Sequence, residues 1–301
     1  MSRSVTIQMP GCTSNCGPGF DTLGIALTLH NFVELTLTSD TTYIGGEDYG
    51  KGTQDMVDEV ANLFFHKAGI EPRGFKYDIW GEVPRARGLS SSATVRCGIV
   101  AALNSLLGVN MSQEDMIALV SGLERAPDGV VACFKGGFCV SRIDPEAGTY
   151  SGSMRFEVPK SIAMVVVSPD TEVSTVVQRE ALPDTIPFQD VVKSTNSLSW
   201  IVAAFASGQY ELLKNAVTDY IHEPYRERLC PFTKEAIRAG MEKGAFCGWL
   251  SGSGSSVLCV CLQDDAIEVG KAMFKTFHSN GIQARLLKLR TANTGLKILE
   301  S

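Results

Sequence analysis

The sequence predicts an α+β fold divided into two domains. Strand-like and helix-like segments are mixed without a regular β-α-β-α alternation, which favours α+β over a doubly wound parallel sheet. The chain has 301 residues, 44% hydrophobic and 20% charged, as expected for a soluble globular protein long enough for two domains. We place the boundary near Pro159, so that the predicted domains are residues 1–158 and 159–301.

The first domain is expected to contain short strands and helices. A strand at 5–9 leads into a glycine-rich loop at 10–24, and apolar residues alternate again within a strand at 25–38. The segment 53–69 has apolar residues at helical spacing and ends at Gly69, which predicts an amphipathic helix. The further elements expected here are a strand at 75–83, a buried helix at 91–107, a helix at 113–123 capped by Ser112, and strands at 138–143 and 154–158.

The second domain is expected to begin with an apolar strand at 162–167 and to continue mainly as helix. The predicted helices lie at 173–180, 188–206, 209–219 and 232–243. Two strands, at 245–250 and 257–262, flank a Gly/Ser-rich turn. A helix at 264–280, a strand at 282–289 and a short strand at 295–299 complete the expected elements.

The composition of the chain argues against some classes of partner. The net charge of −6 does not favour binding to nucleic acid or to an anionic membrane, which need a basic surface. No segment approaches the roughly 20 apolar residues of a membrane span, and the first residues lack the pattern of a signal peptide. The nine cysteines include no C-x-x-C pair, so reduced, buried thiols in a cytoplasmic protein are favoured over a metal site.

One ten-residue segment between the strand at 75–83 and the helix at 91–107 carries the clearest functional signal. Its residues are Pro84, Arg85, Ala86, Arg87, Gly88, Leu89, Ser90, Ser91, Ser92 and Ala93. A glycine and three hydroxyl side chains thus stand at the start of a helix, where backbone N–H groups lack helical partners and the dipole is positive. Such a helix start binds anions, and phosphate is the commonest of them. The segment therefore predicts binding of a phosphorylated nucleotide.

Two further Gly/Ser-rich turns accompany this phosphate loop, at 10–24 and at 250–256. Each alone is a weak signal, because a Gly-Ser-Gly sequence is usually only a tight turn and a serine at a helix start is usually only a cap. The chain has no G-x-x-x-x-G-K-[S/T] sequence, which excludes a Walker loop. The turn at 250–256 approaches a nucleophile elbow, but it lies between two strands with no helix after it.

Together, in this order and spacing, the three turns resemble the GHMP family of small-molecule kinases, nearly from end to end. Finer features are similar to the homoserine kinases of that family. They are Ser14-Asn15 with Gly19-Phe20-Asp21 and Leu23-Gly24, Val173-Ser174-Thr175 with Arg179 and Leu182-Pro183, the segment 223–229 with Pro231, Ser251-Gly252-Ser253-Gly254, and Thr291-Ala292 with Gly295. The resemblance implies an N-terminal domain like domain 2 of ribosomal protein S5, a ferredoxin-like C-terminal domain, and a homodimer.

The resemblance also implies the nucleotide side of the site. The loop from Pro84 to Ala93 wraps the phosphates of ATP, and Ser92 and Glu124 hold Mg²⁺. The third turn, with Ser253, braces the phosphate loop and the acceptor side. Taken alone, Glu124 is better explained as a solvated residue at a helix end, so the matched motifs carry this assignment.

On the acceptor side, the resemblance implies that Asn15 and Asp21 face the acceptor, with Asp21 as the partner of an amino group. Arg179 and Arg226 take the carboxylate, a task that suits the bidentate geometry of arginine. Arg228 remains an alternative to Arg226. Asp128 and Arg179 are the catalytic candidates. Each residue alone is also explained by a capped turn or a surface charge.

The sequence departs from the homoserine kinase pattern in two places. Ala86 and Ser90 stand where those kinases usually carry glycine. The segment after Glu124 is shortened, and Gly129 replaces an asparagine that lies beside the acceptor hydroxyl in the family. Since glycine has no side chain to donate a hydrogen bond, three alternatives stay open: the acceptor is held differently here, is another molecule, or is phosphorylated poorly.

The function that the sequence favours is ATP-dependent phosphorylation of L-homoserine to O-phospho-L-homoserine, on the threonine pathway, by direct in-line transfer. Two alternatives stay open. One is a GHMP kinase acting on another small hydroxylated metabolite. The other is a non-catalytic homologue that keeps the fold and binds a ligand, which Gly129 favours and Glu124 opposes.

Overall fold

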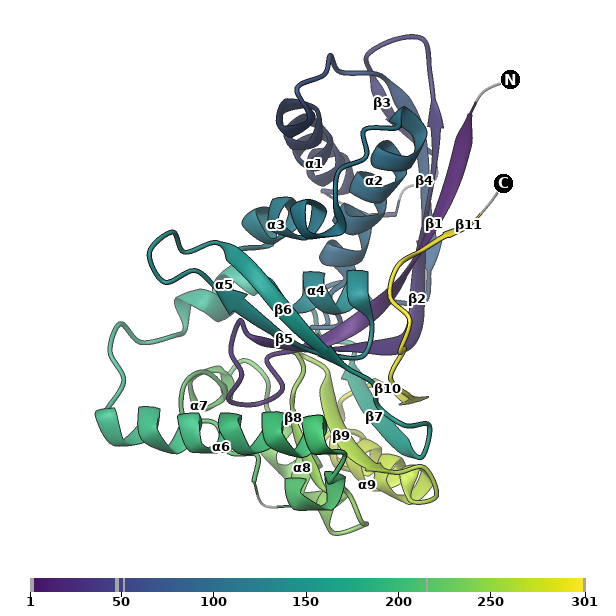
Figure 1. Cartoon of the computed structure of the whole chain (residues 1–301). Coiled ribbons are helices and arrows are strands. Elements are labelled where there is room, and N and C mark those ends of the chain that lie inside the picture. The colour runs from purple at the N-terminus through teal and green to yellow at the C-terminus, as the bar shows by residue number, and fades with distance from the viewer. Residues whose placement is uncertain (1–2, 47–48, 51, 215, 300–301) are drawn as a thin grey trace.

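The computed structural model describes residues 3–46, 49–50, 52–214 and 216–299, which form two sheets with helices packed on them (Figure 1). The first sheet has the strand order β11-β1-β2-β4-β3, and β5 and β6 extend it from the start of β2. Its strands are β1 (Ser4–Ser14), β2 (Leu23–Leu37), β3 (Tyr43–Gly45), β4 (Phe75–Gly81), β5 (Phe138–Ile143), β6 (Tyr150–Phe156) and β11 (Lys297–Leu299). All these pairings are antiparallel except β3 with β4.

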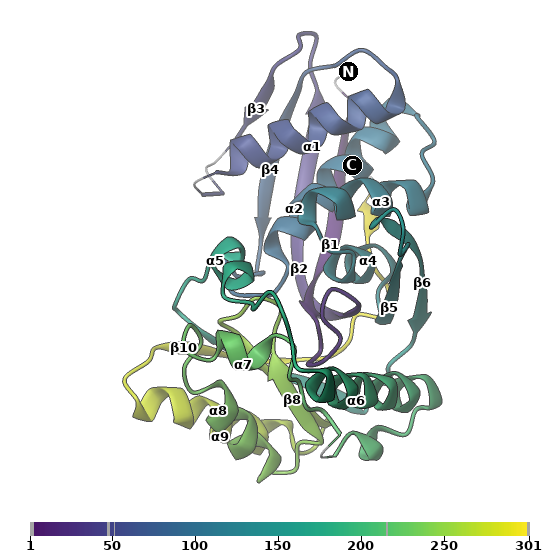
Figure 2. The same cartoon turned by 90° about the vertical axis from the view of Figure 1, so that its left-hand side faces the viewer.

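Four helices cover one face of the first sheet (Figure 2). They are α1 (Thr53–Ala68), α2 (Ser91–Leu107), α3 (Gln113–Glu124) and α4 (Asp128–Lys135). The helix α2 is apolar on nearly every side and is therefore buried at the centre of this layer. Gly69 ends α1, as the sequence predicted. It does so in the left-handed conformation (φ 65°), with its N–H donated to the carbonyl of His66.

The second sheet has the order β10-β7-β9-β8, with every neighbour antiparallel. Its strands are β7 (Ile162–Pro169), β8 (Cys247–Leu250), β9 (Val257–Leu262) and β10 (Ala284–Leu289). Every residue of β7 is buried, which fits the continuous apolar run that predicted this strand. The helices α8 (Thr233–Met241) and α9 (Ala266–Ser279) pack on one face, and α6 (Phe188–Ser207) shares a core with the other face and with β2.

The end of the chain returns from the second sheet to the first. Thr291 forms a bridge to Leu27, and β11 then pairs with β1. The two sheets are thus joined both by a common hydrophobic core and by the last residues of the chain. The domain boundary near Pro159 stays a prediction.

Some elements differ from the sequence prediction. The prediction of a helix at 209–219 is wrong for the described residues of that segment, outside which residue 215 lies. A short 3₁₀ turn, Tyr210–Leu213, stands there instead, and its two end residues, three positions apart, are both buried. The strand β1 runs to Ser14, inside the stretch expected to be loop. The helix α4 was missed because Gly129 lowers its helix propensity, and burial of its residues outweighs that preference.

The two remaining short helices are α5 (Thr175–Glu180), within the predicted 173–180, and α7 (Glu223–Arg226), which no sequence pattern indicated. In the part of the chain that the structure describes, no helix combines the length and the apolar character needed to cross a lipid bilayer.

Candidate active site

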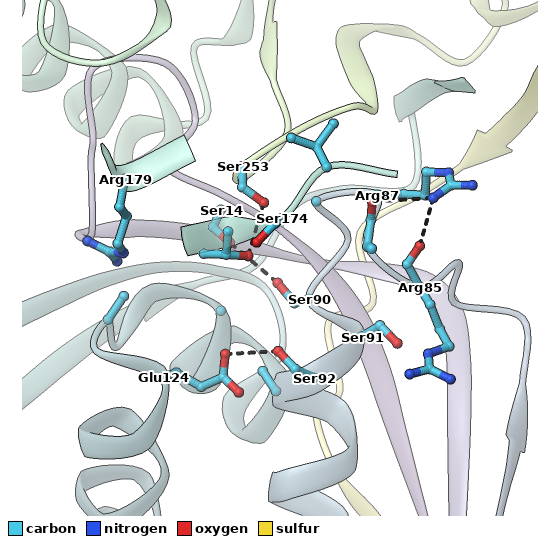
Figure 3. A pocket seen from close by; sticks show the side chains of 18 of the residues that line it. Ser14, Arg85, Arg87, Ser90, Ser91, Ser92, Glu124, Ser174, Arg179 and Ser253 are labelled. Carbon is cyan, nitrogen blue, oxygen red and sulfur yellow. Dashed lines mark hydrogen bonds between the residues drawn. The ribbon is translucent and has the colours of Figure 1, made fainter. Parts of the chain in front are cut away.

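A cavity of about 1080 Å³ is lined by residues from all three Gly/Ser-rich turns (Figure 3). The first turn contributes Ser14 and Asn15, the second Gly88 and Ser90, and the third Gly252 and Ser253. Hydrogen bonds join the turns across more than 200 residues of chain, since Asn15 Nδ2 donates to the carbonyl of Gly252 at 3.0 Å. The grouping that the sequence predicted is therefore present in space.

The second and third turns pack directly on each other. Gly88 has φ 71°, and a Cβ atom there would lie 2.0 Å from the carbonyl oxygen of Ser251. Ser251 Oγ in turn donates to the carbonyl of Gly88 at 2.8 Å. Only glycine meets both requirements at position 88, the positive φ and the close backbone approach.

The second turn presents the N-terminus of α2 to the cavity. Ser91, Ser92 and Ala93 form the first helical turn and line the cavity, where the first amides of a helix lack intrahelical partners. Ser90 precedes the helix in the left-handed conformation (φ 60°), and its hydroxyl meets Ser14 Oγ and the carbonyl of Cys12, both at 3.3 Å. Leu89 instead points into the core between the sheets.

The two arginines of this loop are held by neighbouring segments. Arg85 donates to the carbonyl of Tyr49 and stacks on the Tyr49 ring, 5.1 Å from its centroid. Arg87 donates to the carbonyl of Asp170 at 2.8 Å and lies 3.6 Å from the carboxylate of Glu172. Both arginines line the cavity, as does Ala86, whereas Pro84 is half-buried beside it.

Ser92 and Glu124 meet at one wall of the cavity (Figure 3). Ser92 Oγ donates to Glu124 Oε2 at 2.9 Å, and Arg96 binds the other carboxylate oxygen at 2.5 Å. Arg96 also pairs with Glu59 at 2.7 Å. A hydroxyl and a carboxylate oxygen suit Mg²⁺, which prefers hard oxygen ligands and commonly takes only one or two from protein in phosphate sites. Among the described residues, no group of three or more His, Cys, Asp or Glu could hold a metal by itself.

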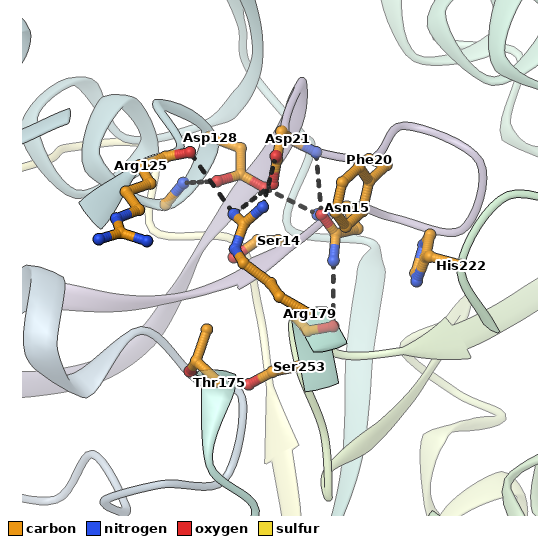
Figure 4. Close-up of polar contacts among 12 residues, drawn as sticks. Ser14, Asn15, Phe20, Asp21, Arg125, Asp128, Thr175, Arg179, His222 and Ser253 are labelled. Carbon is orange, nitrogen blue, oxygen red and sulfur yellow. Dashed lines mark hydrogen bonds and ion pairs between the residues drawn. The ribbon is translucent and has the colours of Figure 1, made fainter. Parts of the chain in front are cut away.

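Asp21 and Arg179 form an ion pair that also lines the cavity (Figure 4). The Arg179 guanidinium donates to both carboxylate oxygens, at 3.0 and 2.9 Å, and lies over the Phe20 ring at 5.4 Å. Asp21 has a left-handed backbone (φ 52°), and its N–H donates to Asn15 Oδ1 at 3.0 Å. The loop between β1 and β2 thus fixes the carboxylate beside the guanidinium.

Arg226 lies deeper, with only 2% of its surface exposed. Its guanidinium donates to the carbonyls of Gln178 and Gly252, and it lies 5.3 Å from the centroid of the Phe20 ring. Arg226 lines the cavity, whereas Arg228, the alternative that the sequence left open, is exposed.

A buried histidine supports Arg226. His222 Nδ1 accepts from Arg226 Nη1 at 3.2 Å, and His222 Nε2 lies 2.8 Å from the carbonyl of Gly17, to which it donates. Burial lowers the pKa of His222 to about 4, so the ring is neutral and can make both bonds. Sequence reasoning missed His222.

Asp128 stands at the start of α4 on the floor of the cavity, 4% exposed. Its carboxylate accepts the N–H groups of Asn15 at 3.2 Å and Gly129 at 2.8 Å. Burial, together with the negative charge of Asp21, raises the pKa of Asp128 to about 7. Asp128 can therefore change its protonation state near neutral pH.

Other cavity residues were not singled out by the sequence. Tyr49 Oη lies 3.2 Å from Ser91 Oγ, and Thr175 Oγ1 lies 3.4 Å from Ser253 Oγ. Thr175 belongs to a segment that carried the family resemblance, so a signal for it existed. Tyr49 follows no pattern and is brought in only by the fold.

Comparisons with known proteins agree with this architecture. The family models described as GHMP kinases N terminal domain and GHMP kinases C terminal match residues 55–137 and 201–279. The homoserine kinase of Carboxydothermus hydrogenoformans is 33% identical, covering 97% of this chain and 95% of that protein. The homoserine kinase of Caldanaerobacter subterraneus subsp. tengcongensis is 30% identical, covering 99% and 96%.

Solved structures give the same result. The homoserine kinase of Cytophaga hutchinsonii has a TM-score of 0.88 at 25% identity, covering 98% of this chain and 97% of that one. Mevalonate diphosphate decarboxylase of Staphylococcus aureus, at a TM-score of 0.73 and 16% identity over 100% and 99% of the chains, shares the fold. The chain therefore belongs to the GHMP kinase family, which makes it a small-molecule kinase that uses ATP.

Proposed function

We propose that this protein transfers the γ-phosphoryl group of ATP to the side-chain hydroxyl of L-homoserine, giving O-phospho-L-homoserine for threonine biosynthesis. The observation that carries the proposal is the Asp21–Arg179 pair in the same cavity as the N-terminus of α2. A carboxylate beside a guanidinium suits an acceptor with an ammonium and a carboxylate group. The similarity to homoserine kinases over nearly the whole chain supports this choice of acceptor.

The nucleotide is proposed to bind along residues 84–93. The amides and hydroxyls of Ser91 and Ser92 would meet the phosphates, because a helix N-terminus combines free donors with a positive dipole. Ser92 and Glu124 would hold Mg²⁺, which neutralises phosphate charge when bound. Arg96 keeps one oxygen of Glu124 occupied and so orients the other toward Ser92.

The acceptor is proposed to lie between Arg179, Arg226 and Asp21. Positioning of the two substrates would supply most of the acceleration, since phosphoryl transfer needs little covalent chemistry from the protein. Asp128 is the group proposed to take the proton of the hydroxyl, because a pKa of about 7 suits a general base near neutral pH. Homodimer formation, a cytoplasmic location and the absence of a nucleic-acid partner stay predictions from the sequence.

An acceptor panel tests the proposal. Purified protein is incubated with ATP, Mg²⁺ and homoserine, serine, threonine, mevalonate or galactose, and ADP release is followed. We expect homoserine to give the highest kcat/KM, with a new phosphomonoester signal in ³¹P NMR. ADP release with another acceptor and not with homoserine would reject the substrate. Nucleotide binding by calorimetry without turnover of any acceptor would favour the ligand-binding homologue.

A further inference from the structure

Ser90 and Gly129 compete for one small space in the cavity. A Cβ atom on Gly129 would lie 2.8 Å from Ser90 Oγ and 3.4 Å from both Ser90 Cβ and Ser14 Oγ. The distance of 2.8 Å to Ser90 Oγ is shorter than the contacts that real Cβ atoms make. Position 129 can therefore carry a side chain only if the Ser90 side chain moves away.

The Ser90 hydroxyl retains a free hydrogen-bonding position in its present place. A serine hydroxyl has one proton to donate and two lone pairs to accept. When Ser90 donates to the carbonyl of Cys12 and accepts from Ser14 Oγ, one lone pair remains for a ligand. Both serines line the cavity (Figure 3).

The location of Ser90 matches that of the reacting centre. It immediately precedes the N-terminus of α2, where the phosphates are proposed to bind. On its other side, Gly129 follows Asp128, whose carboxylate contacts the loop that carries Asp21. In-line transfer requires the acceptor oxygen to lie about 3–3.5 Å from the phosphorus, so the acceptor hydroxyl must be held in this interval.

We propose that Ser90 is the residue that holds the acceptor's reacting hydroxyl, and that Gly129 is glycine because Ser90 occupies the space of its side chain. In the bound complex the acceptor hydroxyl donates to Ser90 Oγ, which keeps its oxygen facing the phosphate, and the same proton passes to Asp128 only as the new P–O bond forms. Specificity for a hydroxylated acceptor thus comes from the phosphate loop rather than from α4. The inference rests on the proposed transfer to an acceptor hydroxyl.

Four variants distinguish the steric effect of the Ser90 side chain on position 129 from its hydrogen bond to the acceptor. They are Ser90→Gly, Gly129→Asn, Ser90→Gly/Gly129→Asn and Ser90→Gly/Gly129→Ala. Glycine suits φ 60° at position 90, so Ser90→Gly removes the hydroxyl without straining the loop. We expect Ser90→Gly to lower kcat/KM for the acceptor about tenfold, the effect of one hydrogen bond, and to leave KM for ATP within about twofold. Gly129→Asn should lose at least as much.

The double variants give the decisive comparison. Ser90→Gly/Gly129→Asn regains both space and a polar group, so its kcat/KM should exceed that of Gly129→Asn by at least about fivefold. Ser90→Gly/Gly129→Ala regains space alone and should stay at the level of Ser90→Gly. Wild-type kinetics for Ser90→Gly, or a double asparagine variant no better than Gly129→Asn, would overturn the inference.

The outcome is separable from the proposed function. If wild-type protein ignores homoserine but uses another acceptor, the substrate assignment fails, and the same four variants are measured with that acceptor. The competition of the two side chains for one space can also be measured without any substrate. Gly129→Asn should lower the melting temperature by several degrees, and adding Ser90→Gly to that variant should restore most of the loss. If the changes in melting temperature of the two single variants simply added up in the double variant, the two side chains would not compete for the same space. As a control, Asn110→Gly replaces another left-handed residue (φ 59°) outside the cavity. This variant should change neither the melting temperature nor kcat/KM for the acceptor.

Discussion

Arg179 binds Asp21 through both of its terminal nitrogens, and both residues line the cavity (Figure 4). The two side chains are 32% and 21% exposed, so a ligand can reach them. An amino acid carries the same two charges in one molecule. Its carboxylate can replace Asp21 beside Arg179 while its ammonium replaces Arg179 beside Asp21. Such an exchange leaves no charge unpaired in a partly buried site, which would otherwise be costly.

Replacement of Arg179 tests this exchange of partners. Arg179→Ala should raise KM for homoserine about 10- to 100-fold, because hydrogen bonds to charged groups contribute about 1.5–3 kcal/mol. KM for ATP should change less than about threefold, because the phosphate loop is untouched. Arg228→Ala is the matched control, since that arginine is exposed and outside the cavity lining. Equal effects on both substrates would contradict the assignment.

Glu124 is expected to set the requirement for Mg²⁺. Glu124→Gln should raise the Mg²⁺ concentration for half-maximal activity at least about tenfold, because the amide lacks the carboxylate charge. Glu59→Gln is the control, since Glu59 shares Arg96 with Glu124 and its loss disturbs the same arginine. Titration of activity with Mg²⁺ at a fixed ATP concentration distinguishes the Glu124→Gln variant from the Glu59→Gln control. The same shift in both variants would mean that Arg96, not a metal, explains the effect.

Activity should depend on pH through Asp128. Its pKa is raised to about 7, so the carboxyl is mostly protonated at pH 6 and mostly ionised at pH 8. If the ionised form accepts the proton, kcat/KM for the acceptor rises about tenfold per pH unit below pH 7 and levels off above it. Asp128→Asn should remove this dependence and lower kcat about 10²- to 10⁴-fold. The exposed Asp184→Asn should retain the wild-type profile. A flat wild-type profile from pH 6 to 8 would exclude Asp128 as the base.

The polar bridge between the two sheets should contribute to stability. Thr13 Oγ1 accepts from Trp249 Nε1 at 2.9 Å and lies 2.9 Å from Ser251 Oγ, to which it can donate while Ser251 donates to the carbonyl of Gly88, and all three side chains are buried. Thr13→Val leaves the indole N–H unpaired and should cost about 1–3 kcal/mol in the free energy of unfolding. Urea denaturation measures this loss. Thr13→Val/Trp249→Phe removes both partners, so its loss should be smaller than the sum of the single losses.

Local patterns account for what the sequence predicted well. The phosphate loop was visible because glycine and serines precede an apolar helix, and β7 because a buried strand reads as a continuous apolar run. The wrong helix at 209–219 and the missed α4 share one cause. In both segments, burial of particular side chains in the tertiary structure outweighs local helix preference.

The finer geometry of the site depends on contacts between distant residues. Asn15 binds the carbonyl of Gly252. Arg226 points inward and binds His222 and Gly252, whereas its neighbour Arg228 is exposed at the surface. Spacing along one chain does not encode such contacts. Gly129 was recognisable as a departure from the family, but the reason for it, the side chain of Ser90, became visible only in three dimensions.

The most direct test is a crystal structure with a non-hydrolysable ATP analogue, Mg²⁺ and L-homoserine. The account predicts phosphate oxygens against the amides of Ser91 and Ser92, and the homoserine carboxylate within hydrogen-bonding distance of Arg179. Phosphates bound away from the start of α2, or homoserine bound outside the cavity that contains Asp21, would contradict it.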